Sequence, residues 1–321
     1  MPLTRPYPAG RPALELDGVH AGFLSSSAGG DAVGEVVSEK PGPDRVIRKH
    51  LAAVRYTDIV LQCGPGMSST FFDWLGLTTA LKQERRDGAV VATDLDGKER
   101  SRLEFARALV RSIALPALDA ASKDAANLTV TLAPEQTRRR AGTGARIEAG
   151  PVAPQKKWLP ANFRLRIDEL ECRKVTAVAP ITITTALAEQ AVGELRDSRR
   201  EPEHLEVSDL VVTLPETDAA TWDSWFESFV IGGVVQEKSG TLEYLAADLK
   251  AVLFTLSFAG LGIYRLHRPR LQSGADTVAR VTASLFCEQI LFTAGAVKPV
   301  ARPVRPVVDP TRVRPDIRIG G

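Results

Sequence analysis

Residues 54–61 read VRYTDIVL, and residues 205–212, which lie 151 positions later, read LEVSDLVV. Both stretches mix apolar and polar side chains around one aspartate, with the period of two that is typical of a β-strand with one buried face. Trp74 and Trp225 are also 151 positions apart. The shared order and spacing of these matches predict that the chain is an internal duplication.

Further matches extend the duplication in both directions, at offsets that drift only from 151 to 153. They are Asp17 with Asp168, Gly88 with Gly240, residues 103–106 with 256–259, Pro116 with Pro269, and residues 135–136 with 288–289. With 321 residues, of which 44% are apolar, the chain has room for about two average domains with ordinary cores. Identity outside these positions is low, so we expect the two repeats to have diverged and to do different jobs in one assembly.

Each repeat shows strand patterns on both sides of one helix pattern. The predicted strands are 54–61, 89–93, 103–113 and 128–132 in the first repeat, and 174–185, 205–214, 251–257, 262–271 and 279–292 in the second. In the second repeat Trp222, Trp225, Phe226 and Phe229 have helical spacing, and we expect Thr217 or Asp218 to cap this helix. In the first repeat Ser68 or Ser69 precedes a similar run that contains Phe71, Phe72 and Trp74.

The aromatic stripe of each helix is interpreted as the face that packs on a sheet, with a ligand groove as the weaker alternative. The predicted fold class is therefore mainly β (α+β): two tandem β-sandwich or barrel domains, each with one packed helix.

Composition shifts suggest the domain boundaries. We expect domains at residues 1–137 and 161–293, joined by a basic linker at 138–160 that includes Arg138, Arg139 and Arg140. The segment 294–321 is rich in proline and arginine and is expected to be an extended tail.

Several classes of function lack support in the sequence. The net charge of +2 gives no global attraction to nucleic acid or to an anionic membrane. No segment contains the roughly 18 apolar residues that a membrane-spanning helix needs, and the N-terminus lacks the apolar core of a signal peptide. The three cysteines, Cys63, Cys172 and Cys287, are expected to be buried free thiols in a reducing compartment.

The residues that carry chemistry are scattered. The four histidines stand singly, and no HExxH, CxxC or phosphate-loop pattern occurs, so we predict no catalytic residue, metal site or cofactor. Asp17, Asp58 and their counterparts Asp168 and Asp209 are interpreted as turn and strand-edge residues rather than as catalytic acids. An enzyme hidden in the loops is the least favoured hypothesis.

The run from Arg48 to Gly64, RKHLAAVRYTDIVLQCG, resembles the most characteristic stretch of the tail tube proteins of contractile phages and related injection systems. That family typically shows Arg-Lys, then Pro-Gly, then a strand of the form Val-Lys-Tyr-Ser-Asn-Ile-Thr-Leu that ends near a glycine. Here Leu51-Ala52 replaces Pro-Gly. The resemblance is strong in the first repeat and weak in the second, which lacks the Arg-Lys signature.

The resemblance implies a structural ring component of a phage tail or contractile injection system, one that forms or caps the inner tube. It implies that strands of neighbouring domains join into a continuous β-barrel around a lumen. Open sheet edges also favour pairing with another chain, and ring closure removes such edges. Because ordinary members form six-membered rings, two fused domains predict a trimer that is a pseudo-hexamer.

The implied partners are further copies of the chain, stacked tube rings, and sheath or baseplate proteins; DNA or protein cargo in the lumen stays open, and no membrane is expected. The implied location is the bacterial cytoplasm during assembly and then the virion tail or injection particle. The residues that we predict to contribute to assembly are Arg48, Lys49, Arg55, Tyr56, Trp74, Trp222, Trp225, Arg138, Arg139 and Arg140.

Two alternatives to a plain tube component remain. The chain could be a baseplate hub or adaptor ring that joins the tube to a spike, because divergence of the repeats suits a layer between sixfold and threefold parts. It could also be a binding module whose arginine-rich linker and tail hold a nucleic acid or an acidic partner.

Overall fold

The computed structural model describes residues 10–41, 43, 45–147, 158–191, 198–269 and 279–295. The first repeat contains β1 (Ala13–Leu16), β2 (Val19–Gly29), β3 (Ala32–Ser38), β4 (Lys49–Tyr56), β5 (Ile59–Cys63), α1 (Ser69–Thr79), β6 (Arg86–Thr93), β7 (Glu99–Leu115), β8 (Leu118–Asp119), β9 (Leu128–Ala133) and β10 (Gln136–Ala141). The second repeat contains β11 (Phe163–Ile167), β12 (Ala177–Val178), β13 (Ile181–Ala191), β14 (Ser198–Val207), β15 (Leu210–Pro215), the 3-10 turn η1 (Glu216–Asp218), α2 (Ala220–Phe226), the π-helical turn η2 (Glu227–Ile231), β16 (Lys238–Leu245), β17 (Val252–His267) and β18 (Arg280–Ala294).

The first repeat is a closed antiparallel barrel. The strands pair in the order β1-β2-β5-β9-β7-β6, and β6 returns to β1. Closure leaves no free edge within this ring of strands. The alternating burial of β5, in which Ile59, Leu61 and Cys63 point inward, shows how the period-two sequence fills the barrel.

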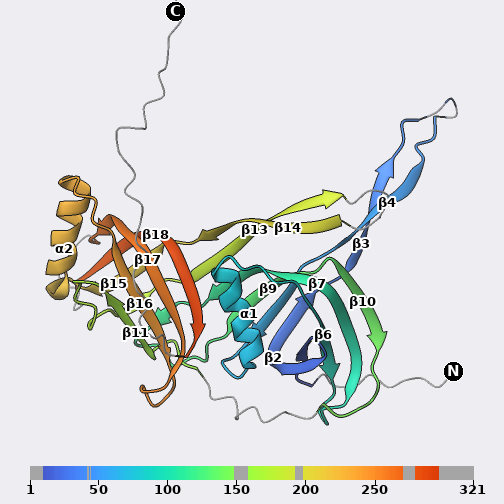
Figure 1. The fold of residues 1–321 in the computed structure, drawn as a ribbon, viewed down its shortest axis with the longest axis horizontal. Helices are drawn as coiled ribbons and strands as arrows, with labels where there is room; N and C mark the ends of the chain where they lie inside the picture. Colours follow the sequence, from blue (N-terminus) through green and yellow to red (C-terminus); the bar gives the residue numbers. More distant parts are fainter. Residues whose placement is uncertain are drawn as a thin grey trace, which may run out of the picture.

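The second repeat uses the equivalent strands but stays open. Its sheet runs β11-β16-β17-β18-β15-β12, and β8 of the first repeat is added beyond β12. The predicted fold class, two tandem barrel-like β domains with one packed helix each, is therefore confirmed, with one barrel closed and one open (Figure 1).

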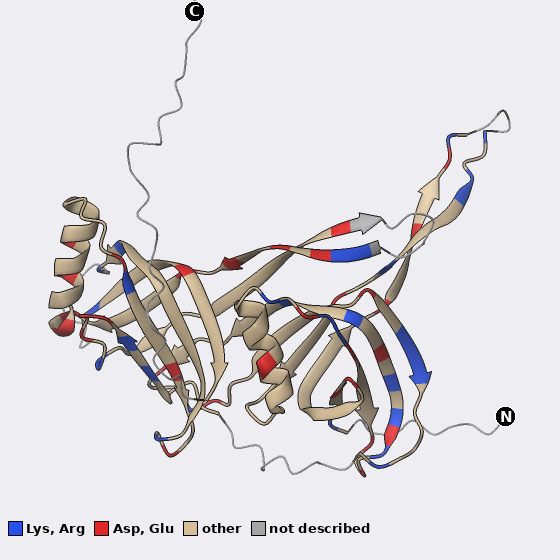
Figure 2. Cartoon of the chain, viewed as in Figure 1, with Lys and Arg blue, Asp and Glu red and all other residues tan. Residues whose placement is uncertain are grey.

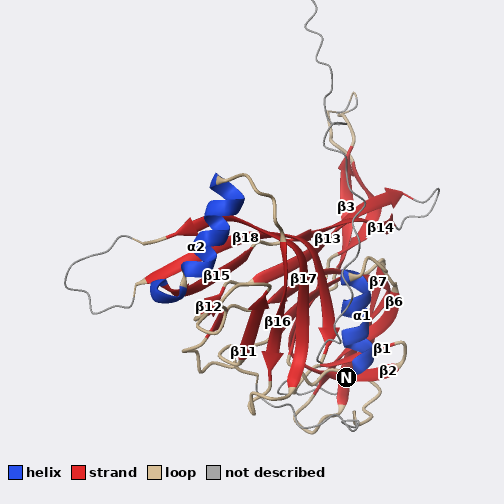
Figure 3. Ribbon diagram, turned by 60° about the vertical axis from the view of Figure 1, so that its left-hand side comes forward, coloured by secondary structure: helices blue, strands red, loops and turns tan. Residues whose placement is uncertain are grey.

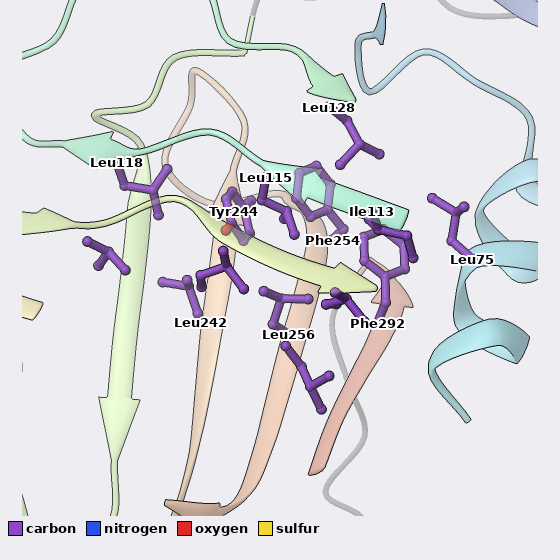
Figure 4. Packing of buried hydrophobic residues seen from close by; sticks show 14 of the residues in the cluster. Leu75, Ile113, Leu115, Leu118, Leu128, Leu242, Tyr244, Phe254, Leu256 and Phe292 are labelled. Carbon is purple, nitrogen blue, oxygen red and sulfur yellow. The ribbon is translucent and has the colours of Figure 1, made fainter. Parts of the chain in front are cut away.

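The two repeats exchange strands rather than fold as separate units. In addition to the β8–β12 pairing, β13 of the second repeat pairs with β7 of the first. A single cluster of buried residues continues through both repeats, and Figure 4 shows Ile113 and Leu115 of β7 beside Tyr244, Phe254 and Phe292 of the second repeat. The junction is thus a shared core and not a linker-joined contact.

The helices begin where local signals allow. Ser68 caps α1, because its side chain accepts a hydrogen bond from the backbone N–H of Phe71. For α2 the predicted caps Thr217 and Asp218 are wrong, because these residues form the 3-10 turn η1 and Ala219 occupies the cap position.

Three other sequence predictions need correction. The strands predicted at 54–61 and 205–214 are each two strands, which break at Asp58 and at Asp209. The strands predicted at 251–257 and 262–271 are one long strand, β17, which absorbs the interruption at Gly260 through a positive φ of 67°. The linker predicted from residue 138 begins later, because residues 136–141 form β10 on the edge of β7. Residues 148–157 and 296–321, where the rest of the linker and nearly all of the tail were expected, lie outside the described residues.

All three cysteines are free, and two of them are buried. Burial raises the pKa of Cys63 to about 12 and that of Cys172 and Cys287 to about 11. Because the thiolate is the reactive form, we expect the folded chain to resist alkylation by iodoacetamide at pH 8, whereas the chain unfolded in guanidinium takes up one label per cysteine. Intact mass measures the difference; labelling of Cys63 in the folded chain at the rate of a free thiol would contradict this packing.

Candidate assembly interface

Each repeat carries one long hairpin, and the two hairpins have the same register. Ala32 pairs with Tyr56 in the first hairpin (β3–β4), and Ile183 pairs with Val207 in the second (β13–β14). Both hairpins then shift register at equivalent positions and continue with the pair of Ser38 and Lys49 in the first, and of Glu189 and Arg200 in the second. The two hairpins are therefore equivalent elements of the two repeats, in different structural environments.

The settings differ in what covers the hairpin. In the second hairpin, residues 181–184 of β13 pair with residues 112–115 of β7, and Ile181, Ile183 and Thr185 are buried. In the first hairpin every residue of β3 is exposed. The hairpin projects away from the body of the molecule (Figures 1 and 3) and exposes the apolar side chains of Val33, Val36, Val37, Val46, Ile47 and Leu51. A two-stranded hairpin of this kind is only marginally stable by itself, and its edges invite pairing.

A buried arginine fixes the second hairpin to the first repeat. The Arg200 side chain is 8% exposed, and its guanidinium lies 3.0 Å from Asp58 Oδ1 and 3.6 Å from Glu189 Oε1. It also donates a hydrogen bond to the carbonyl oxygen of Tyr56. Arg111 reaches the other oxygen of Asp58 at 2.7 Å. Asp58, which breaks the strand pattern, thus serves as the anchor for the exchanged hairpin.

A second group of charges surrounds this anchor. Arg85 pairs with Glu135 at 3.1 Å and with Glu201 at 2.8 Å, and it donates to the carbonyl oxygen of Arg200. Arg107 also contacts Glu135. The hydrogen bond from Arg85 lowers the pKa of Glu201, so this contact weakens as the pH falls and the carboxylate takes up a proton.

The helix of the first repeat completes the contact between the repeats. On α1 the ring of Phe72 stacks on Phe292 of β18 with centroids 6.1 Å apart, and Thr79 Oγ1 accepts a hydrogen bond from the backbone N–H of Phe292. A Cβ atom on Gly76 would lie 3.0 Å from the Phe292 carbonyl oxygen, which explains the small residue here. This helix–strand contact is apolar.

The residues predicted for assembly fall into three groups, of which the first lies at the projecting hairpin. Arg48, Lys49 and Arg55 are exposed on or beside β4, and Arg55 lies 3.6 Å from Glu35. Tyr56 is partly buried beside Arg200. These four positions therefore belong to the projecting hairpin or its base.

The three tryptophans predicted for assembly lie in the interior of the chain. Trp74, Trp222 and Trp225 are buried in the chain, and each indole N–H donates to a backbone carbonyl oxygen: that of Glu84, of Glu171 and of Gln236, respectively. They hold the helices in place on their own repeats.

The arginine run lies on the exposed strand β10, which is coloured blue along much of its length in Figure 2. Arg139 pairs with Asp31 at 2.9 Å, and Arg140 pairs with Glu104 at 2.6 Å. Two of the three cations thus have acidic partners within the chain, which weakens the interpretation of this run as a nucleic-acid site.

The sequence did not identify the open edge of β17. Over the described strands, the end of β17 at Tyr264–His267 pairs with β18 on one side and has no strand on the other. The equivalent end of β7 is where β13 binds. Both strands shift register at equivalent positions, at residues 110–112 of β7 and 263–265 of β17. These shifts show that the two strand ends are structurally equivalent.

The described part of the chain contains no group of three or more His, Cys, Asp or Glu side chains placed to hold a metal ion. None of its helices combines the length and the apolar character needed to span a membrane.

Comparison with known proteins bears on the first repeat. Residues 15–138 match the family described as T4-like virus tail tube protein gp19. No curated protein matches the chain. Among solved structures, the chain is similar to a protein of an extracellular contractile injection system in its PVC sheath–tube complex, with 22% identity, a TM-score of 0.38 and coverage of 43% of this chain and 94% of that one.

Two further structures have the same degree of likeness. One is from the PVC sheath/tube terminator, with 23% identity, a TM-score of 0.38 and coverage of 43% of this chain and 99% of that one. The other is from the tube-terminating cap of the anti-feeding prophage, with 21% identity, a TM-score of 0.38 and coverage of 44% and 95%. The family match spans most of the barrel, the projecting hairpin and α1 together, so the first repeat of this chain is similar to the T4-like tail tube protein family.

Proposed function

We propose that the chain is a structural component of a phage tail or contractile injection system, and that three chains form a ring of six tube domains that builds or caps the inner tube. The observation that carries the proposal is the exchange of the second hairpin onto β7 within the chain. The equivalents of these two elements are the first hairpin and the edge of β17. Over the described strands, β3 of the first hairpin is exposed, and the end of β17 pairs only with β18.

The contact of the second hairpin with β7 is a head-to-tail interface between the two repeats of one chain, and the same interface can form again between chains. Head-to-tail interfaces close into rings when the rotation between neighbours divides a full turn, and otherwise they continue as open helices. Closure with three chains would remove every hairpin and every β17 edge from solvent. The first repeat is a closed barrel and the second an open one, so the six domains would alternate in kind around the ring.

The alternation of closed and open domains supports a place for this ring at an end or junction of the tube. A ring with threefold symmetry and six similar domains can contact a sixfold ring on one side and a threefold part on the other. Stacked tube rings and sheath or baseplate proteins are the partners that we propose. The particle tail is the proposed location.

Native mass spectrometry of the purified chain tests the proposal. We expect a dominant species of three chains that persists on dilution to micromolar concentration. A monomer at every concentration, or a ring of six whole chains, would contradict it.

A further inference from the structure

We infer that the chain boundary in this ring carries a charge code: the basic first hairpin of one chain binds an acidic face on the second repeat of the next chain. The inference rests on the proposed ring, and it names the partner surface and its register. We assume that the first hairpin of one chain binds the edge of β17 in the next chain in the same way that the second hairpin binds β7 within the chain.

The strand register across the boundary between chains follows from the pairing within the chain. Within the chain, Ile183 pairs with Ile113 and Thr184 pairs with Ser112. The hairpin offset of 151 and the strand offset of 153 convert these pairs into Ala32 with Leu266 and Val33 with Arg265 of the neighbouring chain. Both β17 positions lie on the edge that has no strand beside it in the described chain.

The receiving faces of the two repeats differ in charge. On the first repeat the face that holds the exchanged hairpin carries Asp58, Arg85, Arg107, Arg111 and Glu135. At the equivalent positions of the second repeat stand Asp209, Glu237, Gly260, Tyr264 and Glu288. At these five positions three arginines are thus replaced by a carboxylate, a glycine and a tyrosine, which makes the set acidic, while the β17 edge beside it carries Arg265 and Arg268 in place of Ser112 and Leu115. The Tyr264 hydroxyl donates a hydrogen bond to Asp209 at 2.5 Å, at the position where the Arg111 guanidinium forms an ion pair with Asp58.

The hairpins differ in the matching sense. Arg199, Arg200 and Glu201 of the second hairpin correspond to Arg48, Lys49 and His50 of the first. The carboxylate that Arg85 binds within the chain is therefore absent from the first hairpin, and Lys49 takes the position of Arg200. In the transposed contact Lys49 faces Asp209, and His50 faces Glu237.

The helix side of the contact follows the same rule. Phe72 and Gly76 of α1, which meet Phe292 within the chain, correspond to Asp223 and Glu227 of the second repeat, and Phe292 corresponds to Arg139. Between chains, α2 would therefore present Asp223, which pairs with Arg268 at 2.6 Å, and Glu227 opposite Arg139, which pairs with Asp31 of its own chain. Figure 2 shows acidic residues on α2 and basic residues on β10, at opposite ends of the molecule.

The code has a consequence for specificity. A first hairpin that approached the β7 face of another chain would place His50 where Glu201 binds Arg85 within the chain, so that ion pair would be lost, whereas the β17 face has Glu237 at the position of Arg85. Loss of an ion pair at the wrong face and gain of a favourable pair at the right face both contribute to the choice of partner. The charges thus favour strict alternation of first and second repeats around the ring.

Engineered disulfides test the register. Cysteines at Val33 and Arg265 of the same chain lie in different subunits of the ring, opposite each other across an antiparallel pair, within the usual disulfide distance. We expect oxidation to give covalent trimers on non-reducing gels. Cysteines at Val36 and Arg265, three residues out of register, are the control and are expected to give none. Equal cross-linking of both pairs, or of neither, would overturn the inferred register.

Charge exchange tests the code. We expect Lys49→Asp and Asp209→Lys each to raise the concentration at half-assembly at least about tenfold, and the double variant to recover most of the loss. Lys123→Glu, on an exposed turn, is the control and is expected to assemble like the parent. Parental assembly of Lys49→Asp, or failure of the double variant to recover, would overturn the charge code.

The outcomes separate this inference from the proposed function. Trimers by mass without the Val33–Arg265 cross-link would leave the ring standing and reject the interface. The cross-link in open ladders longer than three chains would support the interface and reject the three-chain ring.

Discussion

Shortening the first hairpin is expected to abolish ring assembly while leaving the chain folded. The cut replaces residues 34–54 by Asn-Gly, which joins Val33 to Arg55 through a two-residue turn and keeps their cross-strand pairing. The described residues of the removed segment are exposed, apart from the partly buried residues 52–54, so the loss costs the isolated chain little stability. It also removes Lys49 and most of the apolar surface of the hairpin, so we expect the affinity between chains to fall by a factor of about a hundred or more, equivalent to about 3 kcal/mol.

The matched control is the same cut in the second hairpin, with residues 185–205 replaced by Asn-Gly between Thr184 and Glu206. This cut removes Arg200 and Glu201 and leaves Asp58 and Arg85 without those partners. We expect the free energy of unfolding of the chain itself to fall by about 3–5 kcal/mol. Denaturant titration and native mass spectrometry are run on both variants. Two cuts with the same effect on either measurement would show that the hairpins do not have the different roles assigned here.

Replacing Asp58 by alanine is expected to be among the most destabilising single changes in the chain. It leaves the guanidinium of Arg200, which is 8% exposed, without its nearest carboxylate, and it removes the partner of Arg111. Breaking a buried ion pair from one side costs about 3–5 kcal/mol, and the partial exposure of Asp58 places the expected loss near the lower end, at about 3 kcal/mol. Urea denaturation of the chain measures it.

The equivalent change in the second repeat, Asp209→Ala, separates folding from assembly. Within the described chain Asp209 accepts one hydrogen bond from the exposed Tyr264 hydroxyl, so we expect a loss of less than about 1 kcal/mol in the stability of the chain. Because Lys49 of the neighbouring chain loses its carboxylate, ring formation weakens instead. Equal destabilisation by the two alanines would contradict the asymmetry between the repeats.

The sequence was sufficient to reveal the duplication, the strand and helix order and the family resemblance, because these depend on local periodicity and on the spacing of residues such as Trp74 and Trp225. Local patterns do not specify which strand lies beside which. The pairing of β13 with β7 therefore appeared only in the structure, although its residues alternate as a strand should. Pairing partners are selected by packing over long sequence distances, which a pattern of period two does not record.

Charge patterns misled in a similar way. Arg138, Arg139 and Arg140 have the composition of a solvated linker, yet they form an edge strand whose outward positions tolerate cations. Asp58 was assigned to a strand edge, which is correct, but its role as the anchor of Arg200 depends on a hairpin 142 residues away. The aromatic side chains of the helices were expected to pack on a sheet, and Phe72 does so on Phe292 of the other repeat.

Single-particle electron cryomicroscopy of the assembled protein tests the central claim most directly. We predict rings with threefold symmetry and six domain positions, in which β3 of each chain is hydrogen-bonded to residues 265–267 of β17 in the next chain. Rings with true sixfold symmetry of whole chains, or particles in which the first hairpin is exposed to solvent, would contradict the account.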